Sequence, residues 1–229
     1  MADELQRADP HAPTLCAGWD VAHLAAHLVL RDNRPEVMLA GAVRVAGLSE
    51  YADRRLDAAA TSTPYAQLVE LVRRGPRLSP TRIRVVDDAV NTIEMAVHRE
   101  DVRRGGPDWQ PAAMPVPLDP GVSAVLARSM STVGRLAARS VPGPLDACLT
   151  DVPAAPGQAG WPARSDGVGV PAGSPQRVVL RSGPGEPVIV SGPVLEVVLF
   201  LFGRDAAARV ELSGRPNRVA AVRSARRGA

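Results

Sequence analysis

The stretch Asn91-Thr-Ile-Glu94-Met-Ala-Val-His98 decides the fold, because its apolar and polar residues recur with the period of a helix. Glu94 and His98 are four residues apart, so their side chains share one face. Such pairs also occur on exposed helices as surface salt bridges, and the pair alone does not establish a site. Ile93 and Val97 lie beside it, however, and a carboxylate on a buried face needs a partner or a metal. The stretch therefore predicts a helix with an inward-facing polar pair, and we expect Val90 on the same side.

A second polar pair lies in Trp19-Asp-Val-Ala-His23-Leu-Ala-Ala-His27, where the two histidines also share a helical face. One imidazole from this helix, together with Glu94 and His98, would make the ligand set of an open, catalytic-type zinc site. Spacing does not decide which histidine is the ligand. The other one could support a ligand through a hydrogen bond or act as an acid–base group. The HExxH motif is absent, so a metalloprotease is not indicated.

The same kind of pattern predicts several further elements along the chain. Helices are expected over 20–40 with a kink or an end at Pro35, and over 65–74, 87–105 and 122–140. Residues 141–175 are rich in Pro and Gly, which predicts a linker or a long loop. Beyond them we expect strands over 177–181, 187–191 and 210–213, and a helix over 194–207.

This order of elements predicts a mainly α protein with a small α+β part. A helical domain over 1–140 would be followed by the linker over 141–175 and a small C-terminal α/β domain over 176–229. The scarcity of aromatic residues means that Leu, Val and Ala must build the core. Ala-rich segments of that kind favour helices.

Composition and charge limit the classes of function. The formal net charge is only +3, and no aromatic residues are interleaved with the arginines, so nucleic-acid binding is not expected. The longest apolar run, 194–202, is too short for a membrane span. Cys16 and Cys148 are far apart in sequence, which excludes a disulfide framework and favours the reducing cytoplasm. Cys16 could be a nucleophile near His23, but a packing role is the commoner use of such a residue.

Three segments, in this order, resemble the mycothiol-dependent maleylpyruvate isomerase-like proteins of the DinB-like superfamily. They are Pro13-Thr-Leu-Cys-Ala-Gly-Trp19 with the helix through His27, Val90-Asn-Thr-Ile-Glu94-Met-Ala-Val-His98-Arg-Glu-Asp101, and Val188-Ile-Val-Ser-Gly192 with Leu199-Phe-Leu-Phe-Gly203-Arg204. The resemblance runs from about residue 12 to 213, with a gap over the Pro/Gly-rich stretch. It is strongest to a subgroup of actinobacterial metal-binding proteins.

The resemblance implies a DinB-like four-helix bundle that holds a divalent metal, usually zinc. The ligands carried over are His27, Glu94 and His98. The position of His23 is often Asp in relatives, so His23 is predicted as a catalytic residue rather than a ligand. Arg204 corresponds to a family arginine near the active cleft and would hold a carboxylate. The segment before Pro13 is short for the family, so we expect a shortened first helix.

The resemblance also implies mycothiol as a thiol cofactor and a small electrophilic molecule as substrate. The metal would lower the pKa of the thiol, which would then catalyse a cis–trans isomerisation or be transferred to the electrophile. We expect a cytoplasmic monomer or homodimer with no nucleic-acid or membrane partner. Two alternatives stay open: a non-catalytic metal-binding module for regulation or interaction, and a helical domain without metal.

Overall fold

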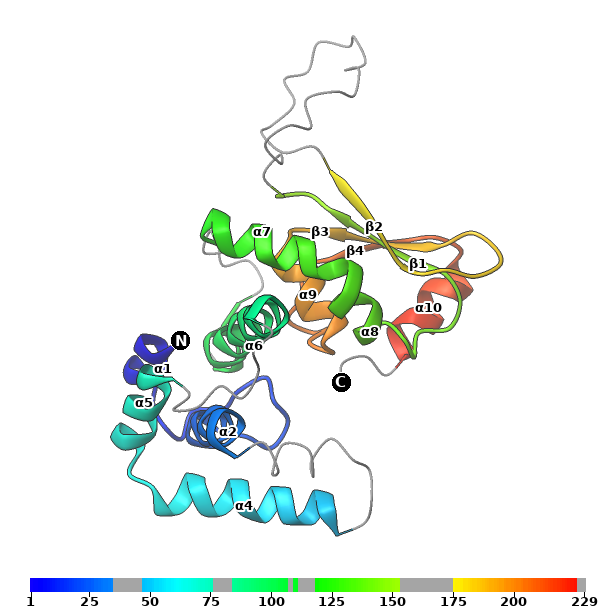
Figure 1. Cartoon of the computed structure of the whole chain (residues 1–229). Coiled ribbons are helices and arrows are strands. Elements are labelled where there is room, and N and C mark those ends of the chain that lie inside the picture. Colours follow the sequence, from blue (N-terminus) through cyan, green and yellow to red (C-terminus); the bar gives the residue numbers. More distant parts are fainter. Residues whose placement is uncertain (35–46, 76–83, 107–108, 111–117, 153–174, 226–229) are drawn as a thin grey trace. The chain divides into compact units, whose positions relative to one another are not determined.

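The computed structural model describes residues 1–34, 47–75, 84–106, 109–110, 118–152 and 175–225, and it divides the chain into two compact units. The first unit comprises Met1–Ala113 and is helical, and the second, Met114–Ala229, combines helices with a small sheet (Figure 1). The predicted fold class, mainly α with a small α/β part, is confirmed. Within the described ranges, no helix is long and apolar enough to cross a membrane.

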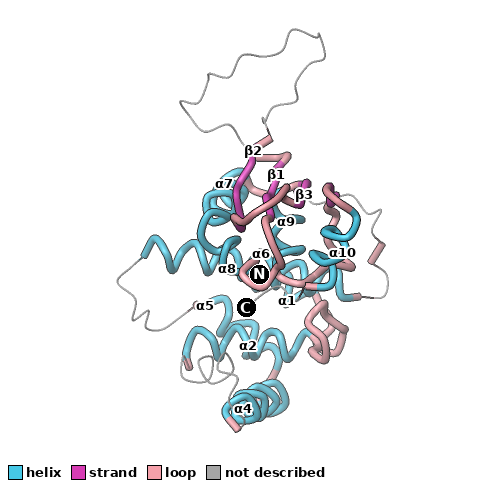
Figure 2. Tube along the Cα trace, turned by 90° about the vertical axis from the view of Figure 1, so that its right-hand side faces the viewer, coloured by secondary structure: helices cyan, strands magenta, loops and turns pink. Residues whose placement is uncertain are grey.

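The first unit is built around helix α2. Its helices are α1 (Ala2–Arg7), α2 (Val21–Asn33), α4 (Leu48–Ser62), α5 (Tyr65–Arg74) and α6 (Arg84–Gly105). Helix α2 contacts α4 and α5, and α1 contacts α5 and α6. Both views show α4 crossing α2 rather than running along it (Figures 1 and 2). The core contains Leu24 and Leu28 of α2 with Leu5, Leu56 and Leu68 from the helices around it.

The predicted helices of this unit are present, and one further helix was not predicted. Helix α5 has the predicted limits, while α6 begins at Arg84 rather than at residue 87. Helix α2 ends at Asn33, and the rest of the expected helix, 35–40, lies outside the described residues. Helix α4 escaped prediction because Leu56 is its only residue that is fully buried. A helix with so little buried apolar surface has no clear stripe in its sequence.

The second unit joins helices to a four-stranded mixed sheet. Its elements are α7 (Pro120–Ser129), a π-helical turn (Met130–Gly134), α8 (Arg135–Ala137), β1 (Leu145–Leu149), β2 (Gln176–Arg181), β3 (Val188–Gly192), α9 (Val194–Leu201), β4 (Glu211–Ser213) and α10 (Pro216–Ser224). The strand order is β2-β1-β3-β4, with β1 parallel to β3 and antiparallel to β2 (Figure 1). All eight residues of α9 are buried, so this helix forms the centre of the unit.

Two assignments change in this region. The predicted helix over 122–140 consists of α7, the π-helical turn and α8; it was grouped with the first domain, but α7 contacts α9 within the second unit. The predicted linker over 141–175 is wrong at Leu145–Leu149, which forms β1 between β2 and β3. This strand is short and is flanked by Pro and Gly, which hid its pattern. Residues 153–174 lie outside the described part of the chain.

Candidate metal centre

His27, Glu94 and His98 come together in the first unit. Each offers one ligand atom, and these three atoms lie within 4.8 Å of one another. Helix α2 carries His27, and α6 carries the other two residues one turn apart. The predicted apolar face of α6 holds for Ile93 and Val97, which are 1% and 2% exposed. It does not extend to Val90, which is 41% exposed, so the expectation for Val90 is wrong.

Glu94 is held in an ion pair with Arg31, which lies one turn after His27 on α2. The other Nη of Arg31 donates to Asp32 at 2.7 Å and to Asn91 at 2.6 Å, so the guanidinium is fixed from both helices. Burial lowers the pKa of Arg31, but Glu94 and Asp32 outweigh it and raise that pKa above its ordinary value. The guanidinium therefore stays charged. It binds Oε2 of Glu94 and leaves Oε1 outside the ion pair.

His98 is held from its other side by a buried carboxylate. Nδ1 of His98 lies 2.9 Å from Oδ2 of Asp101, and Asp101 is fully buried. The same oxygen accepts a hydrogen bond of 3.2 Å from Sγ of Cys16. Cys16, His98 and Asp101 also form a second group with ligand atoms within 4.8 Å. Asp101 was not among the predicted site residues, although its spacing of three residues from His98 places both on one helical face.

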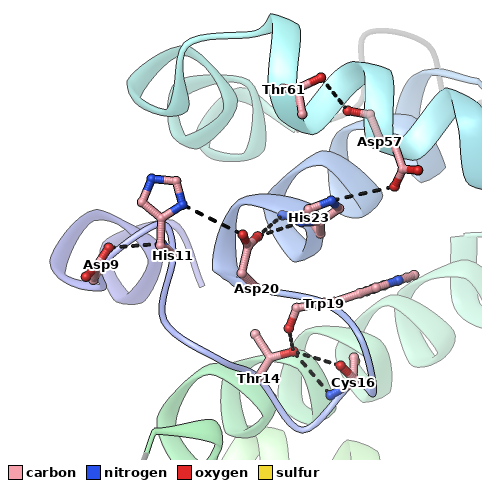
Figure 3. Close-up of polar contacts among 9 residues, drawn as sticks. All are labelled: Asp9, His11, Thr14, Cys16, Trp19, Asp20, His23, Asp57 and Thr61. Atoms are coloured by element: carbon pink, nitrogen blue, oxygen red, sulfur yellow. Dashed lines mark hydrogen bonds and ion pairs between the residues drawn. The ribbon is translucent and has the colours of Figure 1, made fainter.

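The loop Pro13–Trp19 brings Cys16 and Trp19 to this cluster. Figure 3 shows this loop with Thr14, Cys16 and Trp19. Oγ1 of Thr14 donates to the carbonyl of Trp19 at 2.8 Å and closes the loop on itself. The backbone N–H of Leu15 donates to the carbonyl of Asp101 at 3.1 Å. Gly105 permits this contact, because a Cβ there would lie 2.3 Å from Cα of Thr14.

Ring contacts connect Trp19 to His27 and His27 to His98. The ring centroids of Trp19 and His27 are 5.0 Å apart, and those of His27 and His98 are 5.2 Å apart. The loop therefore contacts both ligand candidates, His27 through an indole ring and His98 through Asp101.

His23 is engaged elsewhere, between the N-terminus of α2 and helix α4 (Figure 3). Its Nδ1 lies 2.7 Å from Oδ1 of Asp20, and its Nε2 lies 3.6 Å from Oδ1 of Asp57. Asp20 also caps α2 by accepting the backbone N–H of His23 at 2.9 Å. Burial raises the pKa of Asp20, but these hydrogen bonds outweigh it and lower that pKa below its ordinary value. The catalytic role of His23 stays a prediction.

Arg204, the other predicted catalytic residue, lies just after α9 in the second unit. Its Nη1 donates to the carbonyl of Phe202 at 2.6 Å. This contact fixes the guanidinium locally and leaves its predicted role as a carboxylate anchor untested.

The first unit is thus a helical domain that carries a cluster of two imidazoles and one carboxylate. Residues 1–103 match the family described as the mycothiol maleylpyruvate isomerase N-terminal domain. This match confirms, over residues 1–103, the resemblance drawn from the sequence. The matched region contains both helices of the cluster. No curated protein and no solved structure matches the chain.

Proposed function

We propose that His27, Glu94 and His98 bind one divalent metal ion, zinc by preference, and that the protein uses a low-molecular-weight thiol on a small electrophilic substrate. The observation that carries this proposal is the gathering of the three ligand atoms within 4.8 Å on two helices. Membership of residues 1–103 in the mycothiol maleylpyruvate isomerase N-terminal domain family supports mycothiol as the thiol. The reaction would be an isomerisation or a transfer of the thiol to the electrophile.

The donor set fits zinc in both chemistry and arrangement. Two imidazoles and one carboxylate are the protein ligands of several catalytic zinc sites, whose fourth position stays open. Zinc lies about 2.0–2.2 Å from such ligands, so the three donors would have to close to roughly 3.4 Å from one another. Glu94 supplies this adjustment most easily, since its side chain is 27% exposed and only one of its oxygens is bound by Arg31.

A bound zinc ion would supply a positive charge that lowers the pKa of a thiol placed beside it. The residues of the chain set the conditions for this. Arg31 holds Glu94, Asp101 holds His98, and Trp19 packs against His27, so the ligands are ordered before any ion arrives. Ligands that are ordered in this way lose little freedom on binding.

His23 and Arg204 remain our predicted catalytic residues for this reaction, His23 as an acid–base group and Arg204 as the anchor of a carboxylate. For His23 a structural role competes with this prediction, because both ring nitrogens lie near carboxylates of Asp20 and Asp57. Turnover by His23→Ala and Arg204→Ala, measured at saturating thiol, would separate these roles.

The first test is the zinc content and zinc affinity of the wild type beside His27→Ala, Glu94→Gln and His98→Ala. His23→Ala is the matched control, because it removes an imidazole from the same helix one turn away from His27. We expect about one zinc per chain in the wild type and in the control, and an affinity at least about tenfold lower in the three ligand variants. A wild type that stays without zinc after reconstitution would refute the proposal.

The second test addresses the open position and the thiol. Cobalt(II) in place of zinc gives a spectrum that changes when a thiolate binds, so mycothiol is titrated into the cobalt-loaded protein, with glutathione as the comparison. A new sulfur-to-cobalt absorption band and mycothiol-dependent turnover of maleylpyruvate would support an enzyme. A spectrum unchanged at any thiol concentration would instead favour the non-catalytic metal-binding module.

A further inference from the structure

The carboxylate of Asp101 lies beside the cluster, and the proposed ligand set does not use it. Asp101 is 0% exposed and lies on α6 one turn after His98, with the thiol of Cys16 on its other side. A carboxylate in such a place is stable only if donors surround it. Donors to its side chain include Nδ1 of His98 at 2.9 Å and Sγ of Cys16 at 3.2 Å.

These distances fit hydrogen bonds better than a second metal position. Both of these contacts are made to the single oxygen Oδ2, at distances typical of hydrogen bonds. A carboxylate can only accept here, so His98 must place its proton on Nδ1 and Cys16 must donate its S–H. Nε2 of His98 then carries the lone pair.

We propose that Asp101 is a positioning residue, which fixes His98 as the Nδ1–H tautomer and thereby directs the Nε2 lone pair to the metal; this inference rests on the proposed function. The tautomer of a histidine is set by the hydrogen bond that its other nitrogen makes. Carboxylates in this position orient metal-binding histidines, and their loss lowers metal affinity by roughly 10–100-fold. Cys16 is the second donor to Asp101 and secures the carboxylate from the loop Pro13–Trp19.

The loop gives this arrangement its rigidity. Its backbone is bound to α6 through Leu15 and the carbonyl of Asp101, and it approaches α6 closely at Gly105. Asp101 is therefore held by its main chain and its side chain at once. The carboxylate cannot rotate away from His98 without breaking the bond to Cys16.

The test reads the ring nitrogens of His98 by long-range ¹H–¹⁵N correlation in the metal-free protein at about pH 8, above the ordinary pKa of a free imidazole. We expect the Nδ1–H tautomer in the wild type and a shift toward Nε2–H, the form preferred in water, in Asp101→Ala. Zinc affinity should fall roughly 10–100-fold in the same variant. Asp101→Asn keeps an acceptor oxygen beside Nδ1, so it should retain the tautomer and most of the affinity.

Two controls separate this role from a structural one. Asp20→Ala removes the corresponding carboxylate from His23 and should leave both the His98 tautomer and zinc affinity unchanged. Cys16→Ala removes the second donor only and should keep the Nδ1–H tautomer. The wild-type spectrum requires no variant, so a folding defect in Asp101→Ala does not prevent the test.

Two results would overturn the inference: an Nε2–H tautomer of His98 in the wild type, or an Asp101→Ala protein whose tautomer and zinc affinity, within twofold, match the wild type. Failure of the proposed function is a different result. It would show as a wild type that binds no zinc, while the tautomer, read without metal, still decides whether Asp101 orients His98.

Discussion

His23 and His98 are built on the same local pattern, and the difference between their surroundings separates a structural contact from a candidate ligand. Each imidazole places Nδ1 on an aspartate three residues away, at 2.7 Å for Asp20 and at 2.9 Å for Asp101. The side chains of the first pair are 24% and 27% exposed, whereas those of the second are 11% and 0% exposed. Water can replace the first bond but not the second.

The two pairs also differ in what the other ring nitrogen faces. Nε2 of His23 lies 3.6 Å from Asp57, whose side chain is 68% exposed, so this contact is weakened by solvent. His98 instead shares its cluster with His27 and Glu94. A histidine flanked by a carboxylate therefore becomes a ligand candidate only where burial and a second set of donors coincide.

Removing the two aspartates is the most direct way to break this comparison. Asp101→Ala removes the buried acceptor that His98 and Cys16 share, and we expect it to lower the free energy of unfolding by about 3 kcal/mol. Asp20→Ala removes a helix cap that water can replace, and we expect a loss of about 1 kcal/mol. Urea unfolding of both metal-free variants measures the two values. Equal losses would show that burial does not distinguish the pairs.

The sequence predicted the members of the cluster but not the residues that hold them. The spacing of Glu94 and His98 placed them on one face of a helix, and the family resemblance selected His27 over His23. Arg31 lies one turn after His27 on α2, but its pairing with Glu94 depends on how α2 and α6 pack. Such long-range contacts leave no signal in local spacing.

Asp101 and helix α4 mark two other limits of sequence reasoning. Asp101 is three residues from His98, so helical spacing alone could have predicted their contact. A charged residue near a helix end is, however, equally consistent with exposure to solvent. Helix α4 buries only Leu56 fully, and β1 is a five-residue strand within a Pro/Gly-rich stretch. Tertiary packing stabilises both elements, and their own sequences do not indicate them strongly.

Arg31→Met sharpens the comparison at the other end of the cluster. The substitution removes the guanidinium that pairs with the partly buried carboxylate of Glu94. We therefore expect the free energy of unfolding of the metal-free protein to fall by about 2 kcal/mol. Zinc should restore more stability to this variant than to the wild type, because the metal no longer competes with a guanidinium for Glu94.

Arg99→Met is the matched control for this prediction. Arg99 also lies on α6 and pairs with Glu4 at 3.5 Å, but its side chain is 38% exposed. We expect a loss of less than about 0.5 kcal/mol, with no change in the zinc effect. Thermal unfolding with and without zinc measures both variants. If zinc stabilised Arg31→Met no more than the wild type, zinc and Arg31 would not compete for Glu94.

The smallest effect is the pH dependence of the Asp20 cap, which His11 and His23 both face. The folded-state pKa of Asp20 is lowered, so the folded protein releases this proton more readily than the unfolded chain does. The stabilisation is then complete above the ordinary pKa of aspartate, about 4, and is lost as the pH falls through the lowered value.

Asp20→Asn keeps the cap without the charge. Its stability should therefore lie below that of the wild type by about 1 kcal/mol or less near pH 6, and the difference should shrink below about pH 4. Urea unfolding of both proteins between about pH 3 and pH 6 measures this difference, and a constant difference across that range would mean that the charge of Asp20 does not contribute.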